Sequence, residues 1–212
     1  MRYIEYSDDV AMETNLGQQT IQNNNVRLGI QLLIDGENLY MRTVEYLKVR
    51  SRPSDTAAAT EFILARLGEL VDNIEDRDGL RVVLGYYYMT STGVDALRSR
   101  RLFVGFKEQL RQLGVEMVIV DKRNDKSGNI DPRLISDAYR RLLIEMKAPS
   151  NLVLVCGDKD YQPMLEDYEE KGRKVAVCFY RPIGGGASID LLSVEATEFF
   201  DFTNPKQSWT NG

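Results

Sequence analysis

The sequence predicts a three-layer α/β sandwich with a mostly parallel central sheet. Short, continuously apolar runs alternate along the chain with helical patterns, and this alternation is typical of parallel strands that are buried on both faces. Two of the runs stop at the turn pairs Asp35-Gly36 and Gly157-Asp158. With 212 residues, of which 43% are hydrophobic, the chain is long enough for one domain with a substantial core.

Five apolar or β-branched runs are the expected strands, at residues 28–34, 80–88, 115–120, 152–156 and 175–180. The residues between the first run and Asp55 form a polar stretch, to which we assign no element. After the fifth run come a glycine-rich loop at residues 184–186 and a mixed segment that ends at Phe202. No internal repeat is visible.

Four helices are expected between or after these strands, because apolar residues recur there at spacings of three and four. The start signals are Asp55, the pair Thr92 and Asp95, and Asp131-Pro132, and the stop signals are Gly114 and Gly172. The four apolar stripes are Ile63, Leu67, Leu70, Val71 and Ile74; Leu102, Phe106, Leu110 and Leu113; Ile135, Ala138, Leu142 and Met146; and Tyr161, Met164, Leu165 and Tyr168.

The chain divides into three parts by composition. Residues 1–27 contain a Gln- and Asn-rich segment without apolar periodicity, and we interpret them as an N-terminal arm or linker. Residues 28–203 carry the regular pattern and form the predicted domain. Residues 204–212 are the expected C-terminal tail.

Composition excludes several kinds of chemistry. The chain has no histidine, so imidazole-based hydrolysis and histidine-ligated zinc are excluded. Cys156 and Cys178 lie in apolar runs, which favours buried free thiols over a disulfide. No apolar stretch is long enough for a membrane span and no signal peptide is visible, so we expect a cytoplasmic protein. The net charge of −5 means that nucleic-acid binding needs local basic patches.

Acidic residues gather where the predicted strands end. Asp35 follows the first strand, Asp121 the third, and Asp158 and Asp160 the fourth, whereas Asp131 begins a helix. The carboxyl ends of parallel strands meet at one edge of a sheet, so these acids are expected to converge there. Converging carboxylates repel one another, and a hard cation such as Mg²⁺ or Mn²⁺ would offset that repulsion. Asn38 adds an amide on the same turn as Asp35. The alternative for each acid is a turn residue or a helix cap, and for Asp121 we favour a turn residue.

Helical geometry separates the two acids of the third helix. At about 100° per residue, Asp131 projects in the direction of Ala138 and Leu142, toward the sheet. Asp137 projects to the opposite side, beside Arg133 and other arginines, where a surface ion pair is the simpler interpretation.

Three segments in this order resemble the NYN domain, particularly its LabA-like bacterial branch, within the PIN-like nuclease superfamily. They are Ile34-Asp35-Gly36-Glu37-Asn38, the helix start from Asp131 to Asp137, and Gly157-Asp158-Lys159-Asp160-Tyr161. Residues 188–191 and 196–201 also resemble the closing segment of that branch, and the likeness spans about residues 28–203. Two departures are visible. Cys156 stands where the family usually has Ser or Thr, and two extra residues separate Lys126 from Asp131.

The resemblance implies a PIN-like, Rossmann-like architecture and a metal-dependent ribonuclease. Asp35, Asp131, Asp158 and Asp160 would hold Mg²⁺ or Mn²⁺, Asn38 would support them, and the family pattern includes Asp137 among the catalytic residues. Lys122, Arg123 and Lys126 are candidate RNA contacts because their loop follows a strand end, whereas Arg98, Arg100 and Arg101 are more simply a solvated helix face. One of Tyr86, Tyr87 and Tyr88 could stack a base of single-stranded RNA.

Two other classes of function stay open. One is a non-catalytic NYN module that binds RNA or a protein, for which loss of an acid would be the sign. The other is a Mg²⁺-dependent phosphatase or phosphoacceptor, but Asp35-Gly36-Glu37-Asn38 lacks the D-x-D-x-[TV] pattern of haloacid-type phosphatases. NYN relatives often pair, so a homodimer is a further expectation, with an arm at 1–27 that could be exchanged between subunits.

Overall fold

The computed structural model of the protein describes residues 29–48, 53–78, 80–97, 99–121, 130–143, 151–180 and 198–209. Several expectations lie outside these residues: the N-terminal arm at 1–27, the glycine-rich loop at 184–186 and Met146. In the part of the chain that the structure describes, no helix is both long and apolar enough to cross a membrane.

Seven strands form one mostly parallel sheet in the order β3-β2-β1-β4-β5-β6-β7. The strands are β1 (Gly29–Asp35), β2 (Arg81–Thr90), β3 (Val115–Val120), β4 (Asn151–Val155), β5 (Val175–Phe179), β6 (Glu198–Asp201) and β7 (Asn204–Trp209). Neighbours from β3 to β6 pair in parallel, and β7 pairs antiparallel with β6. The five predicted strands are β1 to β5, with small shifts at their ends, and the predicted α/β class is confirmed.

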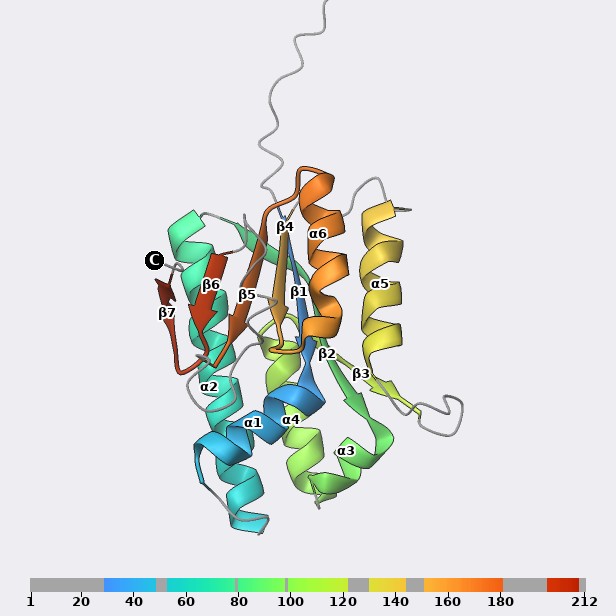
Figure 1. Ribbon diagram of the computed structural model, residues 1–212. Coiled ribbons are helices and arrows are strands. Elements are labelled where there is room, and N and C mark those ends of the chain that lie inside the picture. The colour runs from blue at the N-terminus through green and yellow to red at the C-terminus, as the bar shows by residue number, and fades with distance from the viewer. Residues whose placement is uncertain are drawn as a thin grey trace, which may run out of the picture.

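Helices cover both faces of the sheet (Figure 1). They are α1 (Gly36–Tyr46), α2 (Pro53–Asp78), α3 (Ser91–Ala96), α4 (Arg100–Gln112), α5 (Asp131–Leu143), the 3₁₀ turn η1 (Lys159–Tyr161) and α6 (Gln162–Glu170). One core lies between the sheet and the helices α1, α2 and α4, and a second lies between the sheet and the helices α5 and α6. The protein is therefore a three-layer sandwich.

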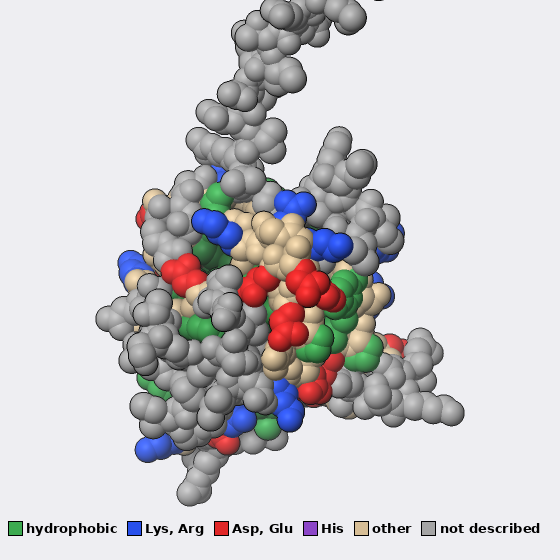
Figure 2. Space-filling view, turned by 45° about the horizontal axis from the view of Figure 1, so that its top comes forward, with side chains coloured by type: hydrophobic (Ala, Val, Ile, Leu, Met, Phe, Trp, Pro, Cys, Tyr) green, Lys and Arg blue, Asp and Glu red, His purple; other side chains and the backbone are tan. Residues whose placement is uncertain are grey.

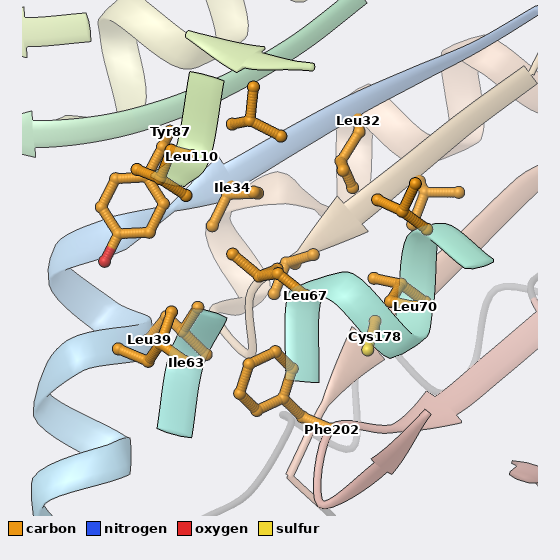
Figure 3. Close-up of a cluster of buried hydrophobic side chains, with 14 of the residues drawn as sticks. Leu32, Ile34, Leu39, Ile63, Leu67, Leu70, Tyr87, Leu110, Cys178 and Phe202 are labelled. Carbon is orange, nitrogen blue, oxygen red and sulfur yellow. The ribbon is translucent and has the colours of Figure 1, made fainter. Parts of the chain in front are cut away.

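The first core is built around the predicted stripe of α2. Ile63, Leu67 and Leu70 are fully buried, and Figure 3 shows Ile63 beside Leu39 of α1 and Leu67 on the side of α2 that faces β1. Burying a side chain of this size stabilises a fold by roughly 1.5–3 kcal/mol. Because β1 contributes buried residues to both cores, all seven of its residues are buried.

Helix α1 corrects the expectation of an irregular polar stretch after Asp35. Its buried positions are only Gly36, Leu39 and Thr43, so the chain offers little apolar periodicity there. Asp35 caps the helix, because its side chain accepts a hydrogen bond from the backbone N–H of Asn38 at 3.0 Å.

Glycine is required at the first position of α1. An added Cβ at Gly36 would lie 2.0 Å from Cε1 of Tyr87, whose hydroxyl donates to the Gly36 carbonyl at 3.1 Å. The aromatic ring of β2 therefore packs directly on the backbone that follows Asp35, and it fixes the start of α1 against the sheet.

The predicted second helix is in fact two helices. Thr90, rather than Thr92, caps α3 by accepting from the N–H of Gly93 at 3.0 Å, and Ser99 caps α4 by accepting from the N–H of Leu102 at 3.4 Å. The expected continuous helix was wrong because a second cap interrupts it. Gly114 ends the segment with φ +75° as expected.

Smaller differences concern the other helix starts and the C-terminus. Helix α2 begins at Pro53, so Asp55 lies in its first turn rather than at its cap. In α5, Leu134 and Ala138 are buried, whereas Ile135 is half-buried. Residues 204–209 form β7 rather than part of the expected C-terminal tail, because Phe199 and Phe200 of β6 pair with that strand.

Candidate metal centre

The strand order reverses between β1 and β4, and this is where open α/β sheets bind their ligands. Asp35 is the last residue of β1, and the segment Cys156-Gly157-Asp158 follows β4. Helix α5 begins at Asp131 beside the same edge, which is the lower edge in Figure 1. Segments that are far apart in the sequence therefore bring their acids to one place.

Three of the predicted acids converge closely. Asp131, Asp158 and Asp160 each offer a carboxylate oxygen, and the three oxygens lie within 4.8 Å of one another. Asp158 caps η1 by accepting from the backbone N–H of Asp160 at 3.1 Å. A single turn thus presents two acids toward the start of α5. An all-oxygen set at this spacing fits a hard divalent cation such as Mg²⁺ or Mn²⁺.

Asp35 is not among these three converging acids. Its carboxylate is buried, and its Oδ2 atom accepts from the Tyr161 hydroxyl at 3.1 Å and from the Cys156 thiol at 3.6 Å. Burial is the main reason that the pKa of Asp35 is raised to about 6, and the charge of Asp131 raises it further. Hydrogen bonds from Asn38, Tyr161 and Cys156 act in the opposite direction.

Tyr161 links Asp35 to Asp131. Its hydroxyl oxygen lies 2.5 Å from Oδ1 of Asp131 and 3.1 Å from Oδ2 of Asp35, and its side chain is buried. Burial and the nearby Asp35 carboxylate raise the pKa of Tyr161 far above its usual range, so the hydroxyl stays protonated and serves as a donor. The sequence pattern places Tyr161 only in an apolar stripe. Its position directly after Asp160 was the available signal for a role at the site.

Cys156 lies between Asp35 and Asp158. Its sulfur is 3.6 Å from Oδ2 of Asp35 and accepts from the backbone N–H of Asp158 at 3.3 Å. Burial, and then the charge of Asp35, raise the pKa of the thiol well above its usual range. Cys156 is therefore a protonated donor to Asp35, and it does not act as a thiolate ligand. Both Cys156 and Cys178 are buried free thiols, as predicted.

Asp137 lies on a different side of α5 from Asp131. Its Oδ2 atom accepts from Nε of Arg133 at 2.9 Å and from the hydroxyl of Tyr88 at 3.2 Å. It is not among the three converging acids. This placement agrees with the geometry of a straight helix, in which residues six apart point in different directions.

A family model for the NYN domain matches residues 29–203 of this chain. The chain belongs to the NYN domain family. NYN domains are part of the PIN-like nuclease superfamily. The matched residues include the strand ends and helix starts that carry the acids, whereas β7 follows them.

A solved structure of a protein of unknown function from Vibrio parahaemolyticus RIMD 2210633 has the same fold as this NYN domain. The two superpose with a TM-score of 0.55 at 17% sequence identity, over 82% of this chain and 92% of the other. At that identity the likeness shows the fold alone. No curated protein matches the chain.

Asn38 adds one more oxygen beside the acids of the NYN domain. Its side-chain Oδ1 atom is buried and has no hydrogen-bond partner among the described residues. A buried amide oxygen without a partner is costly unless water or an ion satisfies it. Asn38 follows Asp35 by three residues and donates its backbone N–H to that carboxylate, so this unsatisfied oxygen belongs to the same turn as the site.

The predicted basic contacts are only partly visible in this NYN domain. Lys122, Arg123 and Lys126 lie outside the described residues, as does Arg98. Arg100 and Arg101 are exposed at the start of α4. Asp121 is exposed after β3 and is not one of the three converging acids.

The tyrosine run divides between the two faces of the sheet. Tyr87 is buried in the core under α1, α2 and α4, whereas Tyr88 is buried in the core under α5 and α6. Tyr86 is half-buried and packs edge-on against Tyr88, with ring centroids 6.0 Å apart. Among the three, Tyr86 is the ring that solvent or a ligand can reach.

Proposed function

We propose that this NYN domain is a metal-dependent ribonuclease that hydrolyses phosphodiester bonds of single-stranded RNA. The observation that carries the proposal is the convergence of Asp131, Asp158 and Asp160 at the reversal point of the strand order. A chain without histidine needs another way to activate water and to neutralise a phosphate, and an oxygen-only cation site offers one.

In this proposal Asp131, Asp158 and Asp160 hold Mg²⁺ or Mn²⁺, and Asp35 is the fourth acid of the same site. When bound, the cation supplies Lewis-acid polarisation of the phosphate and offsets its negative charge. Asp131 is kept in place by the Tyr161 hydroxyl, which also holds Asp35. Asn38 supports the site through its hydrogen bond to Asp35 and through its buried Oδ1 atom. Asp137 has a lesser role at the metal, because it is engaged with Arg133.

The proposal includes finer assignments. The LabA-like branch and a homodimer rest on the resemblance, the RNA contacts through Lys122, Arg123 and Lys126 rest on the position of their loop after a strand end, and the cytoplasmic location rests on composition. Each needs its own test.

The test is cleavage of end-labelled single-stranded RNA with Mn²⁺ or Mg²⁺, with and without EDTA. We expect cleavage that EDTA abolishes and that Asp158→Asn reduces below detection. Glu166→Gln is the matched control, because Glu166 is an exposed acid of α6 that pairs with Gln162 rather than with the site. Wild-type cleavage that persists in EDTA would overturn the proposal.

The same assay separates the main alternative, a non-catalytic module. A wild-type protein that binds RNA tightly but does not cut it with either metal would support that alternative. Calorimetric titration with Mn²⁺ then measures whether the protein binds a cation. In a non-catalytic module, Asp158→Asn should leave the affinity for RNA unchanged.

A further inference from the structure

A second polar hollow lies beside the proposed catalytic site, over the outer strands β2 and β3. It has a volume of about 320 Å³, and Tyr86, Glu116 and Val118 line its floor. Tyr86 pairs with Glu116 across the two strands, and Tyr88 pairs with Val118, so these side chains share one face. We call this hollow the β3 groove.

The wall of the β3 groove is formed by α5. Arg133, Asp137 and Arg140 project into it from that helix. Among the described residues, helix α5 packs mainly against β1, η1 and α6. On the face of β2 and β3 beside it, Tyr86 and Val118 are only partly buried. The groove is near the acids, because Arg133 follows Asp131 by two residues on the same helix.

The groove is held in a defined shape by Asp137. The Asp137 carboxylate accepts from Nε of Arg133 at 2.9 Å and from the Tyr88 hydroxyl at 3.2 Å. Tyr88 in turn packs against the ring of Tyr86. Among the described residues, the terminal nitrogens of Arg133 make no hydrogen bond, and its side chain is 58% exposed. A guanidinium held through Nε presents these nitrogens to a ligand at little entropic cost.

The charge of the groove indicates what it binds. Arg133 and Arg140 are balanced by Asp137 and Glu116, so the groove is not a site for a free anion such as phosphate. The groove instead matches a nucleobase. Tyr86 offers an aromatic face for stacking, the arginines offer hydrogen-bond donors, and the carboxylates offer acceptors for the N–H groups along the edge of a base. Arginine also contacts the phosphates beside a bound base.

On the other side of the site, the surface of α6 is acidic and therefore unfavourable for RNA. Helix α6 carries Glu166, Asp167, Glu169 and Glu170 and no basic residue. Figure 2 shows Asp and Glu side chains gathered on the face that α5 and α6 cover. A polyanion that leaves the acids toward α6 meets like charge, whereas toward β3 it meets two arginines and two acids, which carry no net charge together.

We infer that the β3 groove is a nucleotide subsite, in which one base of a single-stranded RNA stacks on Tyr86 between Glu116 and the arginines of α5. The inference rests on the proposed ribonuclease function, because it names the path of that substrate. It also gives Asp137 a function: Asp137 positions Arg133 for the RNA.

The test measures binding in EDTA, so that it does not depend on catalysis. Fluorescence anisotropy with a labelled 12-nucleotide RNA is compared with a series in which one base at a time is replaced by an abasic residue. For the wild type, one abasic position should weaken binding about tenfold, the usual effect of losing one stacked base. For Tyr86→Leu, binding to the intact RNA should already be about tenfold weaker, and that position should no longer matter.

Arg140→Gln is a second variant, because this exposed residue can change without loss of folding. It should also weaken binding, by about threefold to tenfold. Arg111→Gln is the matched control, since it removes an exposed arginine with a carboxylate partner, Glu108, on α4, and it should bind as the wild type does.

The outcomes separate the inference from the proposed function. If the wild type cuts RNA but Tyr86→Leu and Arg140→Gln bind it unchanged, the subsite is wrong and the nuclease proposal stands. If the abasic effect is lost in Tyr86→Leu but the wild type never cuts RNA, the subsite stands and catalysis is wrong. A wild type that neither binds RNA in EDTA nor cuts it with Mn²⁺ or Mg²⁺ overturns both.

Discussion

The hydroxyl of Tyr161 donates a hydrogen bond to Asp131, with 2.5 Å between the two oxygens. The same hydroxyl lies 3.1 Å from Asp35, so one buried hydroxyl is within hydrogen-bonding distance of two carboxylates. This contact joins the turn after β4 to the first residue of α5. It explains how acids from separate segments keep a fixed arrangement.

We expect Tyr161→Phe to lower the free energy of unfolding by about 1–3 kcal/mol, because it removes a buried hydrogen bond to a carboxylate. Urea denaturation measures the change. Tyr87→Phe is the control. Among the described residues, its buried hydroxyl bonds to the neutral carbonyl of Gly36 alone, so its loss should be smaller, about 1 kcal/mol. A larger loss in Tyr87→Phe would contradict the role of Tyr161.

Asp35 should make the metal-free protein less stable as the pH rises. Its pKa is about 6 in the folded protein against 3.8 for the free side chain, so the folded state binds this proton more tightly. The contribution is therefore fully present below pH 4 and is lost as the pH rises through 6, by about 3 kcal/mol in total. The measurement is the free energy of unfolding in EDTA between pH 4 and pH 8.

Asp35→Asn should remove this decline, because the amide cannot ionise but keeps an oxygen that accepts from the N–H of Asn38. Above pH 7 the variant should be the more stable protein. Glu166→Gln is the control and should keep the slope of the wild type. Parallel pH profiles for the wild type and Asp35→Asn would refute the account of Asp35.

The two acids of α5 should differ in their effect on cleavage. Asp131→Ala should reduce the rate more than about 100-fold, since loss of even an outer-shell partner of a metal site costs 10- to 100-fold. Asp137→Ala should cost less than about tenfold, because it removes an ion pair with the exposed Arg133 and such pairs contribute only ~0–1 kcal/mol. Equal losses in two folded variants would mean that Asp137 acts at the metal, as the family pattern implies.

Gly36→Ala should destabilise the protein by about 1–3 kcal/mol, because the new Cβ would lie 2.0 Å from the Tyr87 ring and force the start of α1 away from β2. Gly105→Ala is the matched control in α4, where no atom lies within 4 Å of an added Cβ. That change should stabilise the helix by about 0.5–1 kcal/mol. Thermal unfolding of both variants decides, and a neutral Gly36→Ala would show that the ring can move.

Much of the arrangement could be predicted from the sequence. The convergence of Asp131 with Asp158 follows from parallel strand ends and helix starts that share one edge, which apolar runs already indicate. The separation of Asp131 from Asp137 follows from helical geometry alone. Both follow from local sequence patterns, because these patterns identify the strands and helices and the parallel sheet then brings their ends together.

Other features could not be predicted because they depend on tertiary contacts. Helix α1 buries Leu39 and Thr43 but has almost no apolar stripe, so its packing rather than its pattern identifies it. The hydroxyl of Tyr161 meets Asp35 and Asp131 only once η1 and α5 are in place. The place of Asp35 outside the group of three acids likewise depends on how its Oδ2 atom meets Tyr161 and Cys156.

The most direct test of the metal site is a crystal structure with Mn²⁺, with the ion located by its anomalous scattering. We predict one strong anomalous peak within coordination distance of carboxylate oxygens from Asp131, Asp158 and Asp160, and no such peak in crystals of Asp158→Asn. Crystals at saturating Mn²⁺ without a peak among these three carboxylates would contradict the account.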